Sequence, residues 1–247
     1  MNTLELTSKI ATIERRRTVK DWQPKESLTQ VQGIVHPSIL RAIELRGLEI
    51  PVGEWTKAFT KEVGSPGIAE ILMGHINDEE NHDRQLEYVA EYLNHTEISD
   101  EAMALTNRWL DHPSHPLVKK TMLEAGVFFP ILGMLGRYAK GDLYLQAVRQ
   151  WISSDEAAHV ASSRLIISYM DERHGGGRYK IPADLLELVV GTIRFICGGI
   201  DEGQWLKSSR SGITTGKIYM GTELTTVSVP EAFTQISNNQ IMYQRVV

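Results

Sequence analysis

The chain has 247 residues, of which 42% are hydrophobic and 23% are charged. This is an ordinary globular composition, and it excludes intrinsic disorder and collagen-like architecture. The formal net charge of −5 provides no overall positive field to hold a phosphate backbone, so nucleic-acid binding is not expected.

Neither the cysteine content nor any apolar segment indicates export or membrane insertion. A single cysteine, Cys197, cannot form an internal disulfide, and the first residues contain no apolar run of the kind that a signal peptide needs. The most apolar segment, residues 185–200, is interrupted by Glu187 and Arg194 and is too short to span a bilayer. We therefore expect a cytoplasmic protein without membrane contact.

The N-terminal half of the chain predicts two long helices after a charged arm. Residues 1–35 show no sustained hydrophobic period, and a solvated arm without function is expected there, including the run Arg15-Arg16-Arg17. The first helix is predicted from Pro37 to about Phe59. A turn follows, and Ser65 then caps a second helix that reaches about Leu93.

The C-terminal half repeats this pattern. After a polar linker with a short helix expected over residues 101–109, a third helix is predicted from Pro116 to Lys140. Asp142 caps a fourth that reaches about Arg173, and a fifth covers about 182–208. The predicted organisation is a helical domain of residues 1–210, with its core at about 37–173, and a tail of residues 211–247. The tail is rich in Ser, Thr, Asn and Gln and is expected to be irregular or short-stranded and to pack on the helices.

One motif occurs twice, once in each half of this helical region. Asp78-Glu-Glu-Asn-His82 and Asp155-Glu-Ala-Ala-His159 lie at matching heights in the second and fourth predicted helices. A glutamate and a histidine three residues apart project side by side from a helix and offer two ligands to one metal ion. Both motifs interrupt otherwise apolar stripes, so their side chains face the core.

The third and first helices offer one further carboxylate each. Glu124 follows the apolar period of the third helix. In the first helix Glu49 and Glu79 are about equally far from the intervening turn, whereas Glu44 matches Glu124 when both are counted from the helix-opening prolines. Glu49 is preferred and Glu44 is the alternative. An ionised carboxylate in an apolar interior costs several kcal/mol, so carboxylates that meet there at one level require a cation.

The charge and type of these groups indicate two metal ions. Four carboxylates balance two divalent cations. Oxygen-rich ligands with one imidazole per metal suit iron or manganese, whereas structural zinc usually takes cysteines, which are absent here.

With these motifs the chain resembles the ferritin-like di-iron carboxylate superfamily over residues 37–173. The signature of that superfamily is a glutamate from each of two helices and a Glu-x-x-His from each of the other two. The resemblance implies an all-α, antiparallel four-helix bundle, here with an additional C-terminal helix. It implies six metal ligands: Glu49, Glu79, His82, Glu124, Glu156 and His159. It also implies that Asp78 and Asp155 accept hydrogen bonds from the ligand histidines of the opposite hairpin. His75 and Phe128 are expected to line a pocket and not to bind metal.

The resemblance also implies a function. We expect a di-iron oxygen-activating oxidoreductase of the hydroxylase or oxygenase type that acts with O2 on a small-molecule substrate, which no motif identifies. Its cofactors would be two iron ions, with manganese or a mixed manganese–iron pair as alternatives, and its electrons would come from a ferredoxin or flavoprotein. A homodimer is left open.

Two alternatives use the same six ligands. A ribonucleotide reductase small-subunit-like radical protein usually carries a tyrosine four residues after the first ligand histidine, where this chain has Leu86. A non-catalytic ferritin-like iron-binding protein is the other alternative.

Overall fold

The computed structural model describes residues 1–17, 22–25, 35–175 and 177–215. Within these residues the chain is predominantly helical and contains no strand, and none of its helices is long and apolar enough to cross a membrane. Of the predicted tail, residues 211–215 extend the last helix and residues 216–247 lie outside the described residues.

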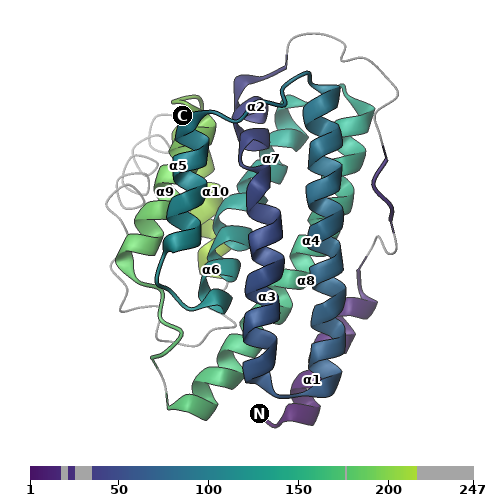
Figure 1. Cartoon of the computed structure of the whole chain (residues 1–247), viewed down its shortest axis with the longest axis vertical. Coiled ribbons are helices and arrows are strands. Elements are labelled where there is room, and N and C mark those ends of the chain that lie inside the picture. Colours follow the sequence, from purple (N-terminus) through teal and green to yellow (C-terminus); the bar gives the residue numbers. More distant parts are fainter. Residues whose placement is uncertain (18–21, 26–34, 176, 216–247) are drawn as a thin grey trace, which may run out of the picture.

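Two long helices carry the repeated motifs. These are α4 (Pro66–Tyr92) and α8 (Leu143–His174), which run side by side in Figure 1. The predicted caps are confirmed, because the side chains of Ser65 and Asp142 accept hydrogen bonds from the first-turn amides of α4 and α8. Gly175, in the left-handed region with φ +84°, ends α8.

The first predicted helix is in fact divided. It consists of α2 (Pro37–Glu44), a 3-10 turn η1 (Arg46–Leu48) and α3 (Glu49–Val63). Pro51 explains the break, because it has no amide hydrogen to donate to the carbonyl of Gly47 as a continuous α-helix would require. In the first turn of α3 this missing donor has no consequence.

The third predicted helix is continuous but widens in the middle. α6 (Pro116–Leu123) passes into a π-helical turn η2 (Glu124–Phe128) and then into α7 (Phe129–Tyr138). Pro130 lies just beyond this turn and cannot donate to a carbonyl four residues earlier, which favours local rewinding there. The wide turn begins at Glu124, one of the predicted ligands.

Four helical segments surround the middle of the molecule. Going around this ring, α3 packs on α4, α4 packs on α8, α8 packs on α6, and α6 packs on α3. This arrangement is compatible with the predicted four-helix bundle.

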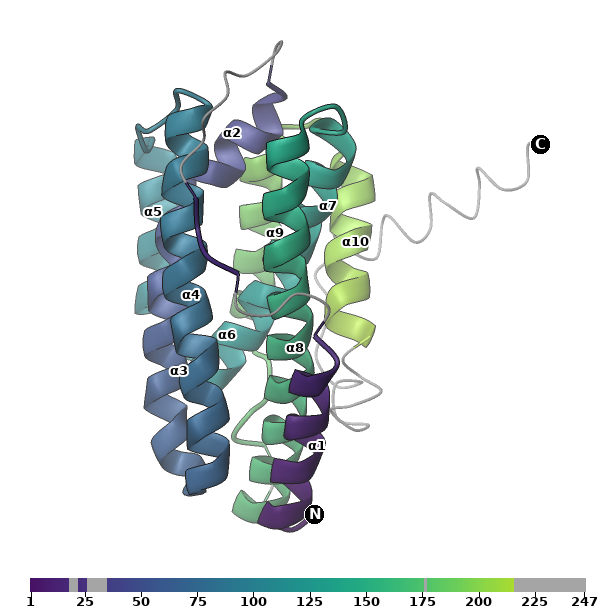
Figure 2. The ribbon, with the colours of Figure 1, turned by 90° about the vertical axis from the view of Figure 1, so that its right-hand side faces the viewer.

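The N-terminal arm is a helix, contrary to the prediction of a solvated segment. α1 (Thr3–Arg15) packs along α8 and α4, and Figure 2 shows it beside the lower part of α8. Leu6 and Ile10, four residues apart, are completely buried, and the side chain of Asn2 caps the helix. Polar contacts from Thr3 to Tyr169 and from Glu14 to His75 also hold this helix in place. Two buried side chains alone give only a weak periodic signal in the sequence.

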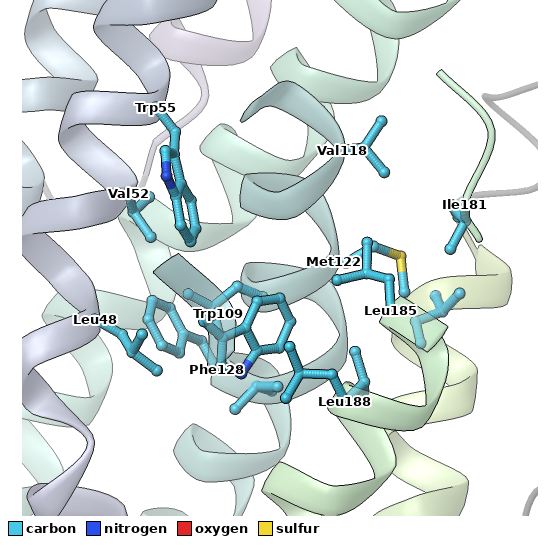
Figure 3. Packing of buried hydrophobic residues seen from close by; sticks show 14 of the residues in the cluster. Leu48, Val52, Trp55, Trp109, Val118, Met122, Phe128, Ile181, Leu185 and Leu188 are labelled. Carbon is cyan, nitrogen blue, oxygen red and sulfur yellow. The ribbon is translucent and has the colours of Figure 1, made fainter. Parts of the chain in front are cut away.

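The remaining helices form a second layer. α5 (Asp100–Asp111) confirms the predicted short helix, but the predicted fifth helix is two, α9 (Ala183–Cys197) and α10 (Glu202–Thr215). Gly198 and Gly199 both adopt positive φ and separate them. Figure 3 shows the apolar core between these layers, with Trp109 of α5 among side chains of α3, α6 and α9.

Candidate metal centre

The six predicted ligands are all buried, each with at most 3% of its surface exposed. They form two groups of four, in each of which one ligand atom per residue lies within 4.8 Å of the others. The first group contains Glu49, Glu79, His82 and Glu156, and the second contains Glu79, Glu124, Glu156 and His159. Glu79 and Glu156 belong to both groups. The cluster therefore has the composition of two adjoining metal sites that share two carboxylates.

Local helix geometry explains why these side chains meet. α4 and α8 each provide a glutamate and a histidine three residues apart, on the face turned toward the other helices. Glu49 is the first residue of α3, directly after the 3-10 turn, and Glu124 is the first residue of the π-helical turn. Both of these ligands thus lie where the backbone departs from a straight α-helix.

The first group, which we call the His82 half-site, is centred on Nδ1 of His82. This nitrogen lies 3.3 Å from Oε1 of Glu156, 3.5 Å from Oε2 of Glu79 and 3.8 Å from Oε2 of Glu49. All four of these buried atoms lack a hydrogen-bond partner in the described structure. Buried polar atoms are seldom left unpaired, and four that converge on one point fit a bound cation.

The second group, the His159 half-site, differs by one unpredicted residue. Nδ1 of His159 lies 3.0 Å from Oε1 of Glu79 and 3.6 Å from Oε1 of Glu124. The ammonium group of Lys120, which is completely buried, donates to the same two oxygens, at 3.2 Å from Glu79 and in closer contact with Glu124. The sequence signal for this lysine was its position one helical turn before Glu124.

The aspartates of the two motifs orient the two candidate ligand histidines through hydrogen bonds on the side of each ring away from the cluster. Nε2 of His82 donates to Asp155 at 3.2 Å, and Nε2 of His159 donates to Asp78 at 3.1 Å. Each bond joins α4 to α8, as the resemblance implies. A hydrogen bond donated from Nε2 leaves Nδ1 of each imidazole facing the cluster, where its lone pair would bind a metal ion once the Nδ1 proton is released.

The N-terminal arm covers these two aspartates. The guanidinium group of Arg17 donates to Asp78 at 3.0 Å and also to Asp155, so the predicted solvated basic run is wrong for this residue. The indole nitrogen of Trp22 donates to Asp155 at 2.7 Å, and the indole ring stacks on His82 with centroids 5.9 Å apart. These contacts join residues at least 60 positions apart and have no local sequence signal.

The electrostatics of the centre are dominated by burial and by mutual repulsion. Burial raises the pKa of Glu49 to about 8, and burial together with the charges of Glu79 and Glu124 raises the pKa of Glu156 to about 7. Burial acts on Glu79 in the same direction, but Lys120 and His159 hold the pKa of Glu79 well below its usual value. The cluster thus has more carboxylates than its own cations can balance.

The structure distinguishes Glu49 from Glu44. The Glu44 carboxylate accepts hydrogen bonds from His95 at 3.0 Å and from the backbone amide of Ser99 at 3.1 Å, and it also contacts the Ser99 hydroxyl. It therefore anchors the start of α5 and is not part of the metal-ligand cluster. The break at η1 separates the two residues, so Glu49 alone reaches the centre.

The two residues predicted to line a pocket have different surroundings. Phe128 and Leu86 line an apolar cavity of about 30 Å³ that also touches Glu49. His75 does not line this cavity. Its Nε2 pairs with Glu14 of α1 at 2.8 Å, and its ring lies against that of His159 with centroids 4.2 Å apart.

Comparison of the chain with protein-family models, with curated proteins and with solved structures finds no match. The character of the centre therefore has to be argued from its geometry. That geometry is a buried cluster of glutamates and histidines within metal-binding distance, compatible with a di-iron site.

Proposed function

We propose that this chain is a ferritin-like di-iron oxidoreductase that activates O2 for the oxidation of a small molecule. The observation that carries the proposal is the sharing of Glu79 and Glu156 between two buried half-sites with one imidazole each. Two-metal centres of this composition hold their ions about 3.5–4 Å apart. Glu79 and Glu156, which come from two different helices, would help to hold both ions.

The donor set supports iron. The six ligands supply eight carboxylate oxygens and two imidazole nitrogens, and no cysteine belongs to the cluster. Such a set suits iron or manganese better than structural zinc. When bound, a pair of ferrous ions would supply the electrons and the open coordination positions that reduction of O2 requires.

The protein's own residues would orient the ligands and exclude water. Asp155 and Asp78 hold the two histidines in the metal-binding tautomer, and Arg17 neutralises part of the charge of both aspartates. Trp22, only 8% exposed, covers His82 with its ring. A covered, preorganised site of this kind protects an oxidising centre from side reactions with solvent.

We place the reacting end of the centre at Glu49. The apolar cavity there is lined by Phe128 and Leu86 and touches Glu49, so it connects an apolar surface to the centre. We therefore infer that O2 and an apolar part of the substrate would approach the metals through this cavity. Leu86 in the cavity wall does not favour the ribonucleotide reductase alternative, which usually places an oxidisable tyrosine at this position.

Oxygen consumption tests the proposal against simple iron binding. Protein loaded anaerobically with Fe(II) is mixed with O2 and excess chemical reductant, and O2 uptake is followed with an electrode. We expect continued uptake well beyond the amount that oxidises the bound iron once, and a matched Glu49→Gln variant should lose it. Uptake that stops after a single oxidation of the bound iron would support the non-catalytic alternative instead.

A further inference from the structure

Lys120 makes the two half-sites unequal. Its ammonium nitrogen contacts Oε1 of Glu79 and Oε1 of Glu124, the two oxygens that also face Nδ1 of His159. It therefore lies among the donor atoms of the His159 half-site and occupies part of the space in which a metal ion would bind. Removing it from this position requires the loss of both contacts.

The His82 half-site has no such internal cation among the described residues. All four of its donor atoms lack a hydrogen-bond partner. The position that corresponds to Lys120, four residues before the carboxylate, is Leu45 for Glu49, and Leu45 is a buried apolar residue. The repeated motif thus predicts two equivalent sites. The two sites differ because Leu45 lies four residues before Glu49, whereas Lys120 lies four residues before Glu124.

We infer that Lys120 is an internal cation that makes metal loading sequential. The first divalent ion binds in the His82 half-site, and the second enters the His159 half-site only when the lysine leaves Glu79 and Glu124. This inference rests on the metal-binding function proposed above, and it adds an order of loading and the residue that sets it.

The charges of the centre support a weaker second binding step. With all four glutamates ionised, as metal binding requires, the glutamates and Lys120 together carry −3, so one divalent ion leaves −1 and a second produces +1. Without the lysine the four ionised glutamates carry −4, and two divalent ions bring the net charge of the cluster to zero. Substituting Lys120 by an uncharged residue should therefore strengthen the second binding step more than the first. Changes to residues around metal ligands typically alter affinity about 10- to 100-fold, and we expect a change of this size.

Anaerobic titration calorimetry with Mn(II), with metal content measured after gel filtration, tests the inference. The wild-type protein should bind one ion tightly and a second at least about 10-fold more weakly. Lys120→Met should bring the two steps together. Lys119→Met is the matched control, because the Lys119 ammonium contacts backbone carbonyls of Trp109 and Leu110 and the ring of Trp55, outside the centre. It should keep the wild-type pattern.

A second pair of variants tests the order without changing the lysine. His159→Ala should keep the tight first step and lose the weak one, whereas His82→Ala should lose the tight step. Two equivalent steps in the wild-type protein, or a Lys120→Met titration identical to that of the wild type, would overturn the inference and leave the proposed centre intact. Failure of the folded wild-type protein to bind any ion would instead overturn the proposed function.

Discussion

Metal removal should reverse the pH dependence of stability between pH 5 and pH 8. Burial raises the pKa of Glu49 from 4.5 to about 8, so the folded metal-free chain keeps this carboxyl protonated over a range in which the unfolded chain releases the proton. The stability contribution of a raised pKa is complete below 4.5 and is lost as the pH rises toward 8. Glu156, whose pKa is raised to about 7, acts in the same direction. So does His82: burial lowers its pKa, but Asp155 and the glutamates outweigh burial and raise the pKa well above its usual value.

The magnitude follows from the shift of Glu49 alone. A difference of 3.5 pKa units at 1.36 kcal/mol per unit corresponds to a loss of about 5 kcal/mol from pH 4.5 to pH 8. The metal-loaded protein should show the opposite slope, because the ions bind the deprotonated ligands and release protons. Loss of metal near pH 8 should therefore destabilise the fold much more than loss of metal near pH 5.

Urea unfolding followed by circular dichroism measures both slopes. The protein is compared at pH 5, 6, 7 and 8 with Mn(II) and with a chelator, in the same buffer series. Falling stability with chelator and rising stability with Mn(II) would agree with a buried, cation-balanced cluster. A metal-free protein that is equally stable at pH 5 and pH 8 would mean that the carboxylates are solvated, and the burial argument would fail.

Five substitutions test individual parts of the centre. Glu49→Gln should weaken metal binding in the His82 half-site, whereas Glu44→Gln should keep full metal content and only lower the melting temperature by loosening α5. Elemental analysis measures the metal content and thermal unfolding measures the melting temperature. The reverse pattern would reject Glu49 as the ligand. His82→Ala and His159→Ala should each abolish two-metal occupancy and sustained O2 uptake, so two retained ions in either variant would refute the assignment of that histidine. Arg17→Ala leaves both aspartates without their shared cation and should lower metal affinity by about 10-fold in a chelator competition, which an unchanged competition curve would contradict.

The candidate ligands of the repeated motif could be predicted from the sequence because their geometry is local. A glutamate and a histidine three residues apart face the same way on any α-helix, and the apolar residues around them set the direction. The structure brings together His82, His159 and the glutamates of both motifs as this rule requires. The equivalence of the two hairpins likewise places Glu124 beside them.

Residues whose position depends on irregular backbone or distant contacts were not accessible in this way. Counting residues to the turn favoured Glu49 but left Glu44 open, because the helix break at η1 that separates the two residues is not included in straight-helix counting. Trp22 reaches Asp155 only through tertiary packing of the arm. Lys120 was visible at the right spacing, but a buried lysine beside metal ligands runs against the ordinary expectation that lysines face solvent.

The most direct test of the proposed centre is a crystal structure of aerobically purified protein with anomalous data collected on both sides of the iron absorption edge. We expect an iron peak bounded by His82, Glu49, Glu79 and Glu156, and after soaking in Fe(II) a second peak near His159, about 3.5–4 Å from the first. If the side chains of the cluster are well ordered and no anomalous peak lies among them even after the Fe(II) soak, the assignment of these residues as a di-iron site is contradicted.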